Sequence, residues 1–159
     1  MSRIDTIFSG DKKALMPFLV AGYPTIESTE DAIIAMDEAG ADIIEIGIPF
    51  SDPIADGPVI AAAMHQALQK GVTPAHAIGV VSRIRDRVSA GLVAMVSESI
   101  VHRSGGSVFL DRLVEAGFDG VIIPDIDDLD AENMSAYCSG CGLTFSMLVS
   151  PTTPPNRIE

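Results

Sequence analysis

Residues 42–50 read Asp42-Ile-Ile-Glu-Ile-Gly-Ile-Pro-Phe50, an apolar run that holds one internal carboxylate. An apolar run of this length, closed by a proline, predicts a buried β-strand over residues 42–48. Side chains alternate between the two faces of a strand, so Glu45 points away from the face that carries Ile44, Ile46 and Ile48. Both faces are otherwise apolar, which is typical of a strand in a parallel sheet that helices cover.

The rest of the chain repeats this kind of strand, and a stretch of helical period follows most of them. Strands are predicted over residues 16–21, 42–48, 92–96, 120–124 and 143–149. Helices are predicted over residues 28–39, 59–69, 74–88, 107–116 and 131–137, with stops at Gly40, Gly71, Gly91 and Gly117. The fold class is therefore α/β, with parallel strands joined by right-handed crossovers.

Two α/β architectures are compatible with this pattern. An open, doubly wound sheet suits a chain of 159 residues, whereas a (β/α)8 barrel typically takes about 250 residues. Length alone therefore favours the open sheet. Residues 154–159 read as the start of a further helix that the chain does not complete.

Composition and charge narrow the class of protein. Apolar residues make up 47% and charged residues 20% of the chain, which suits one globular domain over residues 1–159. The formal net charge of -12 argues against a nucleic-acid partner, because phosphates require a basic surface. No apolar run in the sequence approaches the roughly 18 residues that span a bilayer, and the first residues lack the apolar core of a signal peptide. A cytoplasmic protein without membrane contact is expected.

Three further motifs carry weaker signals. Cys138 and Cys141 form one C-x-x-C, which is compatible with a redox pair or half of a zinc site, but two reduced thiols are the better interpretation. The histidines that a zinc site would need lie far upstream, at His65, His76 and His102. The acidic run 125–130 lacks the ligand spacing of a calcium loop and is interpreted as a helix cap. Residues 104–107, Ser-Gly-Gly-Ser, are interpreted as a plain turn rather than an anion site. No metal site is predicted.

Glu45 is the first candidate for catalysis. An ionised carboxylate in an apolar setting costs several kcal/mol unless it is paired, and burial raises its pKa. A raised pKa suits proton transfer near neutral pH, where a positioned general acid or base contributes roughly 10²- to 10⁴-fold in rate. The competing interpretations are a structural ion pair and a solvent-facing position on an edge strand.

Two more carboxylates follow in the loop Pro49-Phe-Ser-Asp-Pro-Ile-Ala-Asp-Gly-Pro58. This loop lies at the carboxyl end of the strand, where ligands of parallel α/β proteins bind. Asp56 is a candidate functional residue, and its alternative role is a helix N-cap worth about 1 kcal/mol. Asp52 is a candidate as well, and its alternative role is to initiate a turn before Pro53.

The longer stretch Gly40-Ala-Asp-Ile-Ile-Glu-Ile-Gly-Ile-Pro-Phe-Ser-Asp-Pro-Ile-Ala-Asp-Gly-Pro58 closely resembles the hallmark segment of the tryptophan synthase alpha subunit family. Residues 16–24 (Met-Pro-Phe-Leu-Val-Ala-Gly-Tyr-Pro), 70–74 (Lys-Gly-Val-Thr-Pro) and 120–125 (Gly-Val-Ile-Ile-Pro-Asp) add matches in the same order. The resemblance covers essentially the whole chain. It implies a (β/α)8 TIM barrel, of which about the first five βα units are present, in place of the open sheet.

The resemblance also implies an activity. The family cleaves indole-3-glycerol phosphate to indole and glyceraldehyde 3-phosphate by a retro-aldol reaction in tryptophan biosynthesis, without metal or organic cofactor. By motif position, Glu45 matches the general acid/base, and Asp56 matches the carboxylate that binds the indole N–H. Phe18 and Ile60 match residues that make apolar contacts to the indole. Asp52 and Pro53 match the loop that faces the beta subunit in an α2β2 complex.

The chain departs from the family pattern in two ways. After the third strand it reads Met95-Val-Ser-Glu-Ser-Ile100, so Glu98 adds a carboxylate near the expected site. A carboxylate close to Glu45 raises the pKa of a shared proton, whereas a solvated Glu98 has no effect on it.

The second departure is that the last βα units and the glycine-rich phosphate loops of the family are absent from the sequence. The 159 residues are therefore expected to form an incomplete barrel with little or no lyase activity of its own, and to self-associate or be partly disordered. The alternatives are a non-catalytic α/β module that binds the beta subunit, a fragment that binds nothing, and another phosphate-sugar lyase or isomerase on the same barrel.

Overall fold

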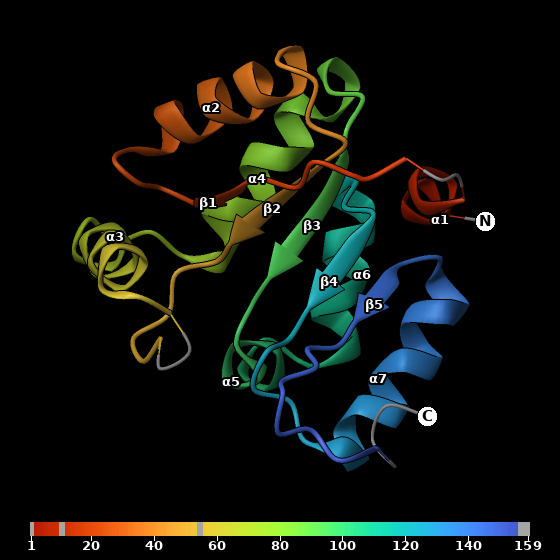
Figure 1. Cartoon of the computed structure of the whole chain (residues 1–159). Helices are drawn as coiled ribbons and strands as arrows, with labels where there is room; N and C mark the ends of the chain where they lie inside the picture. The colour runs from red at the N-terminus through yellow and green to blue at the C-terminus, as the bar shows by residue number, and fades with distance from the viewer. Residues whose placement is uncertain (1, 10–11, 54–55, 156–159) are drawn as a thin grey trace.

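The structure is a computed structural model that describes residues 2–9, 12–53 and 56–155. Five parallel strands form one sheet in the order β1-β2-β3-β4-β5 (Figure 1). The strands are β1 (Phe18–Val20), β2 (Ile43–Gly47), β3 (Gly91–Met95), β4 (Gly120–Ile122) and β5 (Thr144–Ser146). The α-helices are α1 (Arg3–Phe8), α2 (Ile26–Glu38), α3 (Pro58–Gln69), α4 (Pro74–Ile84), α5 (Glu98–Arg103), α6 (Ser107–Ala116) and α7 (Asp128–Cys141), and a 3-10 turn, η1 (Arg85–Arg87), follows α4.

The order of the strands decides between the two predicted architectures. In a doubly wound sheet the strand order reverses at a switch point, where the ligand crevice lies. Here each strand pairs with the strand next to it in sequence, and the order never reverses over the described residues. This is the winding of a (β/α)8 barrel. The preference for an open, doubly wound sheet, which rested on length, is therefore wrong, and the barrel winding implied by the family resemblance is confirmed.

The predicted strands and helices all form, and most of them have shifted ends. Four of the five strands are shorter than predicted, and β5, for example, spans Thr144–Ser146 instead of 143–149, whereas β3 keeps its length and is shifted by one residue. The helix predicted over 74–88 ends at Ile84 and continues as η1. Gly91 does not stop this helix but opens β3, where a Cβ would lie 2.6 Å from Ile4 Cδ1. Position 91 is therefore a glycine because α1 packs too closely against the sheet there to leave room for a side chain.

Two short helices, α1 and α5, are absent from the sequence prediction. The predicted helix start at 154–159 falls largely on residues 156–159, which lie outside the described residues. Over the residues that the structure describes, none of the helices combines the length and the apolar character needed to cross a membrane.

The sheet separates two apolar layers. Helices α2, α4, α6 and α7 cover one face (Figure 1), and the main core lies between these helices and the sheet. Ile44, Ile46 and Ile48 belong to this core and are fully buried. On the opposite face, Ile43 packs with residues of β3 and β4 beneath Ile4 of α1. Glu45 shares that second face with Ile43, as the alternation of side chains predicts.

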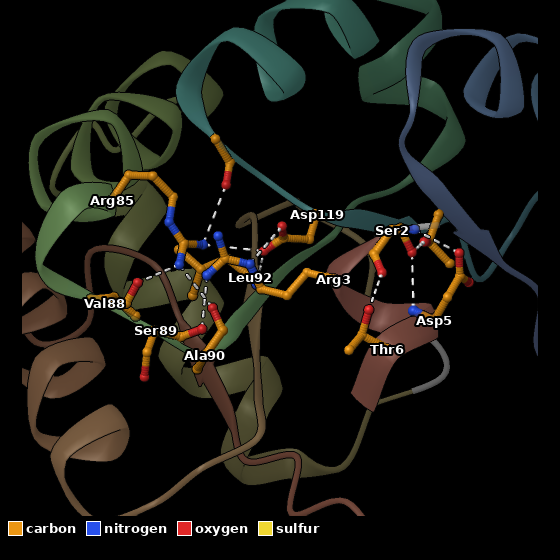
Figure 2. A network of polar contacts seen from close by, with 12 residues as sticks. Ser2, Arg3, Asp5, Thr6, Arg85, Val88, Ser89, Ala90, Leu92 and Asp119 are labelled. Carbon is orange, nitrogen blue, oxygen red and sulfur yellow. Dashed lines mark hydrogen bonds and ion pairs between the residues drawn. The ribbon is translucent and has the colours of Figure 1, made fainter. Parts of the chain in front are cut away.

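A polar network joins the amino ends of the strands (Figure 2). The guanidinium of Arg85 pairs with Asp119 Oδ2 at 3.1 Å and donates to the carbonyl of Ala90 at 2.9 Å. The same carboxylate oxygen accepts the backbone N–H of Leu92 at 2.9 Å, and Arg3 Nε lies 3.3 Å from the other oxygen. The network thus ties α1, η1 and the starts of β3 and β4 together, at the end of the sheet remote from the loop that follows β2.

Candidate active site

Glu45 lies in the middle of β2, between two apolar neighbours in the sheet. In the strand register it stands beside Phe18 of β1 on one side and Val93 of β3 on the other. The Phe18 ring also extends over Gly47, because a Cβ on Gly47 would lie 2.6 Å from Phe18 Cζ. Burial against these groups is the main reason that the pKa of Glu45 is raised above its usual value of 4.5.

Over the described residues, the structure supports neither competing interpretation of Glu45. Strand β2 is flanked by β1 and β3, so the residue does not stand on an edge strand. No lysine, arginine or histidine of residues 2–9, 12–53 and 56–155 forms an ion pair with Glu45. The nearby charge that acts on it is instead that of Asp56, which raises its pKa further. Glu45 is therefore a carboxylate without a compensating cation in the described structure.

Asp56 lies directly before α3 but does not cap it. The N-cap of α3 is Gly57, followed by a proline at the first helical position. The Asp56 backbone N–H donates to the carbonyl of Pro53 at 3.1 Å. Its side chain is half-buried, and this burial raises its pKa. The alternative role of Asp56 as an N-cap is thus not what the structure shows.

A cavity of about 570 Å³ opens at the carboxyl ends of β2, β3 and β4. Its apolar walls include Phe50, Met95 and Leu148, and its polar lining includes Asp52 and Asp56. Cavities of this size suit a small-molecule ligand, and this end of a barrel sheet is where such ligands bind. The cavity therefore combines apolar surface with the carboxylates of the β2 loop.

The predicted apolar contacts, Phe18 and Ile60, belong to one cluster. Both pack against a group of buried residues on β1 and α3 that includes Val20 and Met64. Met95, which lines the cavity, packs against the same group. The structure thus gathers these two side chains in the apolar layer between β1, α3 and the cavity.

Asp52 and Pro53 occupy the outer part of the loop after β2. Asp52 is exposed and lines the cavity, and Pro53 is half-buried. Residues 54 and 55 lie outside the described residues. The two residues thus lie at the surface of the molecule beside the cavity.

The structure adds polar residues that sequence reasoning missed. Asp125 follows β4. Its carboxylate accepts one hydrogen bond from the Ser97 hydroxyl at 2.7 Å and another from the backbone N–H of Glu98 at 2.8 Å. Ser97, Asp125 and the cation of Arg103 all line the cavity. The position of Asp125 just after a predicted strand is a signal that could have found it, because the carboxyl ends of parallel strands meet at one edge.

Glu98 is not among the groups that raise the pKa of Glu45. The charge that raises the pKa of Glu45 after burial is that of Asp56, not Glu98. Glu98 has a raised pKa of its own, caused by burial and then by Asp127. Glu98 thus belongs to a different group of charges.

Two of the three weaker motifs lie in α7 or at its start. Asp127 of the acidic run caps α7 and accepts the backbone N–H of Asp130 at 2.9 Å, which confirms the predicted helix cap. Cys138 and Cys141 are free cysteines on α7. Burial raises the pKa of the Cys138 thiol to about 12, so this thiol stays protonated at neutral pH.

A parallel sheet wound in chain order, with carboxylates and a cavity at the carboxyl ends of its strands, defines the class of (β/α)8-barrel proteins. Comparison with known proteins gives the family. The family model for "Tryptophan synthase alpha chain" matches residues 5–159, and the chain belongs to this family.

Individual relatives agree with this assignment. The tryptophan synthase alpha chain of Prochlorococcus marinus is 40% identical over 157 residues, which cover 99% of this chain and 57% of the relative. That of Rhodopirellula baltica is 40% identical over 159 residues, which cover 98% of this chain and 57% of the relative. The chain therefore spans a little over half the length of these relatives.

Solved structures give the same fold. Tryptophan synthase subunit alpha from Legionella pneumophila matches with a TM-score of 0.93 and 34% identity, over 99% of this chain and 62% of that one. A chain of the aminoacrylate-bound tryptophan synthase from M. tuberculosis matches with a TM-score of 0.92 and 34% identity, over 99% of this chain and 66% of that one. The five-stranded sheet thus superposes on part of a tryptophan synthase alpha barrel.

Proposed function

We propose that this chain provides the acid/base machinery of an indole-3-glycerol-phosphate lyase, the activity of a tryptophan synthase alpha subunit. The substrate would be cleaved by a retro-aldol reaction to indole and glyceraldehyde 3-phosphate in tryptophan biosynthesis. The observation that carries the proposal is the pair Glu45 and Asp56, whose pKa values are both raised by burial and whose charges interact. Asp56 also lines the cavity, and carboxylates with perturbed pKa values at a cavity are typical of catalytic sites.

In this proposal Glu45 moves the protons. It protonates the indole ring at C3 and helps to remove the hydroxyl proton, so it must both give and accept a proton at neutral pH. The burial of Glu45 between Phe18 and Val93 supports this role, because it holds the pKa closer to neutrality than that of a solvated glutamate.

Asp56 binds the indole N–H and stabilises the positive charge that develops on the ring. A carboxylate aimed at a developing charge in a site that excludes water is worth a few kcal/mol. Phe18 and Ile60 supply apolar contacts to the indole, in keeping with their shared cluster next to Met95. These assignments follow the family motif onto the matching positions of this chain.

We also propose that residues 1–159 form a single domain of barrel type, that the protein is cytoplasmic, and that its partner is a tryptophan synthase beta subunit in an α2β2 complex. Asp52 and Pro53 would face this partner, and their position on the surface loop supports that role. Calorimetry with a beta subunit tests it. Asp52→Lys should weaken binding, whereas equal binding by the variant would count against a partner-facing loop.

The lyase proposal is tested best in a hybrid chain, because the relatives extend well beyond the matched part. In the hybrid, this sequence replaces the matching 62% of the Legionella alpha subunit. Indole release from indole-3-glycerol phosphate is then measured for the parent hybrid and for Glu45→Gln and Asp56→Asn. The glutamine variant should lose roughly 10²- to 10⁴-fold in kcat, the usual contribution of a general acid or base. Loss of the Asp56 charge should cost about 10²- to 10³-fold, as for other groups that stabilise a developing charge.

Glu38→Gln, at the exposed end of α2, is the control for loss of a carboxylate. A hybrid that melts cooperatively but releases no indole would overturn the proposal. So would a Glu45→Gln variant that turns over at the parent rate. By contrast, the 159-residue chain by itself is expected to release little indole.

A further inference from the structure

Three side chains of types that can bind a metal ion converge between α5 and α7, and none of them is a residue proposed for catalysis. His102 Nε2 lies 3.5 Å from Glu98 Oε1 and 3.4 Å from Asp130 Oδ2. One ligand atom from each residue falls within 4.8 Å of the other two. Two different helices thus contribute one nitrogen and two oxygen atoms to a single small volume.

The spacing of these atoms is close to that of neighbouring ligands around one metal ion. Hydrogen bonds between nitrogen and oxygen are typically about 2.7–3.2 Å long, shorter than both contacts of His102. Nitrogen and oxygen ligands lie roughly 2.0–2.2 Å from zinc, so neighbouring ligands at the corners of a tetrahedron are roughly 3.4 Å apart. The two distances from His102 Nε2 match this separation.

The backbone already holds the ligands in place. Glu98 and His102 are four residues apart on α5, so their side chains share one face of the helix. The backbone N–H of Glu98 donates a hydrogen bond to the Asp125 carboxylate at 2.8 Å. The backbone N–H of Asp130 donates one to Asp127, the N-cap of α7, at 2.9 Å. Binding an ion would therefore require only small rotations of side chains.

The local charge also favours a cation. Besides the two ligand carboxylates, two further carboxylates lie close by: Asp125 accepts the backbone N–H of Glu98, and Asp127 accepts that of Asp130. A bound divalent ion would offset this concentration of negative charge.

We propose that Glu98, His102 and Asp130 form a binding site for one divalent transition-metal ion of the zinc type, which ties α5 to α7. One imidazole with two carboxylates suits zinc-like ions, whereas magnesium and calcium prefer oxygen ligands alone. Ser99 and Arg103, on the same short helix, line the cavity, so the ion would also fix one wall of the cavity. The site does not depend on the proposed lyase activity.

The sequence alone does not reveal that these three side chains come together, and the reason is physical. The i, i+4 pair Glu98 and His102 is visible in the sequence, but the third ligand comes from the helix after the next strand. Only the pairing of β3 with β4 brings the starts of α5 and α7 together.

The test titrates Co²⁺ and Zn²⁺ into the purified 159-residue chain. We expect one Co²⁺ per chain with the visible absorption of a tetrahedral site, displacement of Co²⁺ by Zn²⁺, and a higher Tm with the metal. His102→Ala should lower the affinity at least about 100-fold, since loss of a ligand exceeds the 10- to 100-fold cost of changing a residue that orients one. Asp130→Asn should weaken binding in the same direction.

His65→Ala, on the exposed surface of α3, is the matched control and should bind like the parent chain. A double change of Cys138 and Cys141 to serine should also leave binding unchanged. The proposal is overturned if no ion binds stoichiometrically, if binding survives His102→Ala, or if the Co²⁺ spectrum shows thiolate bands that vanish with the cysteines. A simple ion pair among the three side chains predicts the first of these results.

Discussion

Glu45 owes its raised pKa to its neighbours in the sheet. Phe18 and Val93 flank it in the strand register, and neither can solvate an ionised carboxylate. A raised pKa in the folded state means that the folded chain holds its proton to a higher pH than the unfolded chain does. Stability contributed by this group is thus complete below pH 4.5, the ordinary pKa, and is lost as the pH rises through the folded pKa.

Glu45→Gln should therefore stabilise the fold at neutral pH, because glutamine cannot ionise. The gain in the free energy of unfolding should be largest at neutral and alkaline pH and should shrink as the pH falls toward 4.5. Urea unfolding across this pH range measures it, with Glu38→Gln as the surface control. A gain that grows toward acid pH would contradict the raised pKa.

At the scale of helices and strands, hydrophobic period predicts which elements exist, and packing decides where they end. The predicted helix over 107–116 coincides with α6, because Gly117 adopts a left-handed conformation and ends it. The sequence does not predict helix α5, because a helix that spans only Glu98–Arg103 has too few turns to show a hydrophobic period. The prediction of Gly91 as a helix stop is wrong, because the residue that requires a glycine there, Ile4, is distant in sequence.

The same distinction applies to the site. Glu45 and Asp56 stand out in the sequence because both belong to one contiguous strand and loop. The contact between Asp125 and Ser97 depends on the pairing of β3 with β4, so local sequence could not predict it.

Gly47 offers a test of packing within the sheet. In Gly47→Ala the new Cβ would lie 2.6 Å from Phe18 Cζ, and the ring would have to move. Overpacking of this kind typically costs about 1–3 kcal/mol, which a urea midpoint resolves. Phe18→Leu in the alanine background should recover part of the loss by making room.

Gly140→Ala in α7 is the matched control, because nothing lies within 4 Å of its Cβ position. It should stabilise the chain by roughly 0.5–1 kcal/mol through helix propensity. If Gly47→Ala were as stable as the parent, the close contact with Phe18 would be ruled out.

At the scale of the whole molecule, β1 and β5 form the two edges of the described sheet. Just after β5, Met147, Leu148 and Val149 are 43%, 59% and 61% exposed. Unpaired strand edges beside apolar side chains favour association with a second chain.

The length of the chain favours an open, doubly wound sheet, and this prediction is wrong because the number of residues carries no information on strand order.

We expect the 159-residue chain to self-associate as its concentration rises. Light scattering coupled to size exclusion should show a mass that increases with loading, and Leu148→Lys with Val149→Lys should reduce it. Val59→Lys is the control, since Val59 is a single apolar residue on α3 that is 79% exposed. A constant monomer mass for the parent chain would refute the expectation.

The network of Arg85 and Asp119 lies at the amino ends of the strands, and the cavity opens at the carboxyl ends. Changes at well-separated sites usually add in their effect on folding free energy. The scaffold is therefore modular in an evolutionary sense. Libraries that randomise the loops after β2 and β3 can be screened for new substrates on one fixed foundation, and stabilising changes near Arg85 can be accumulated beforehand to widen the range of loops that the fold tolerates.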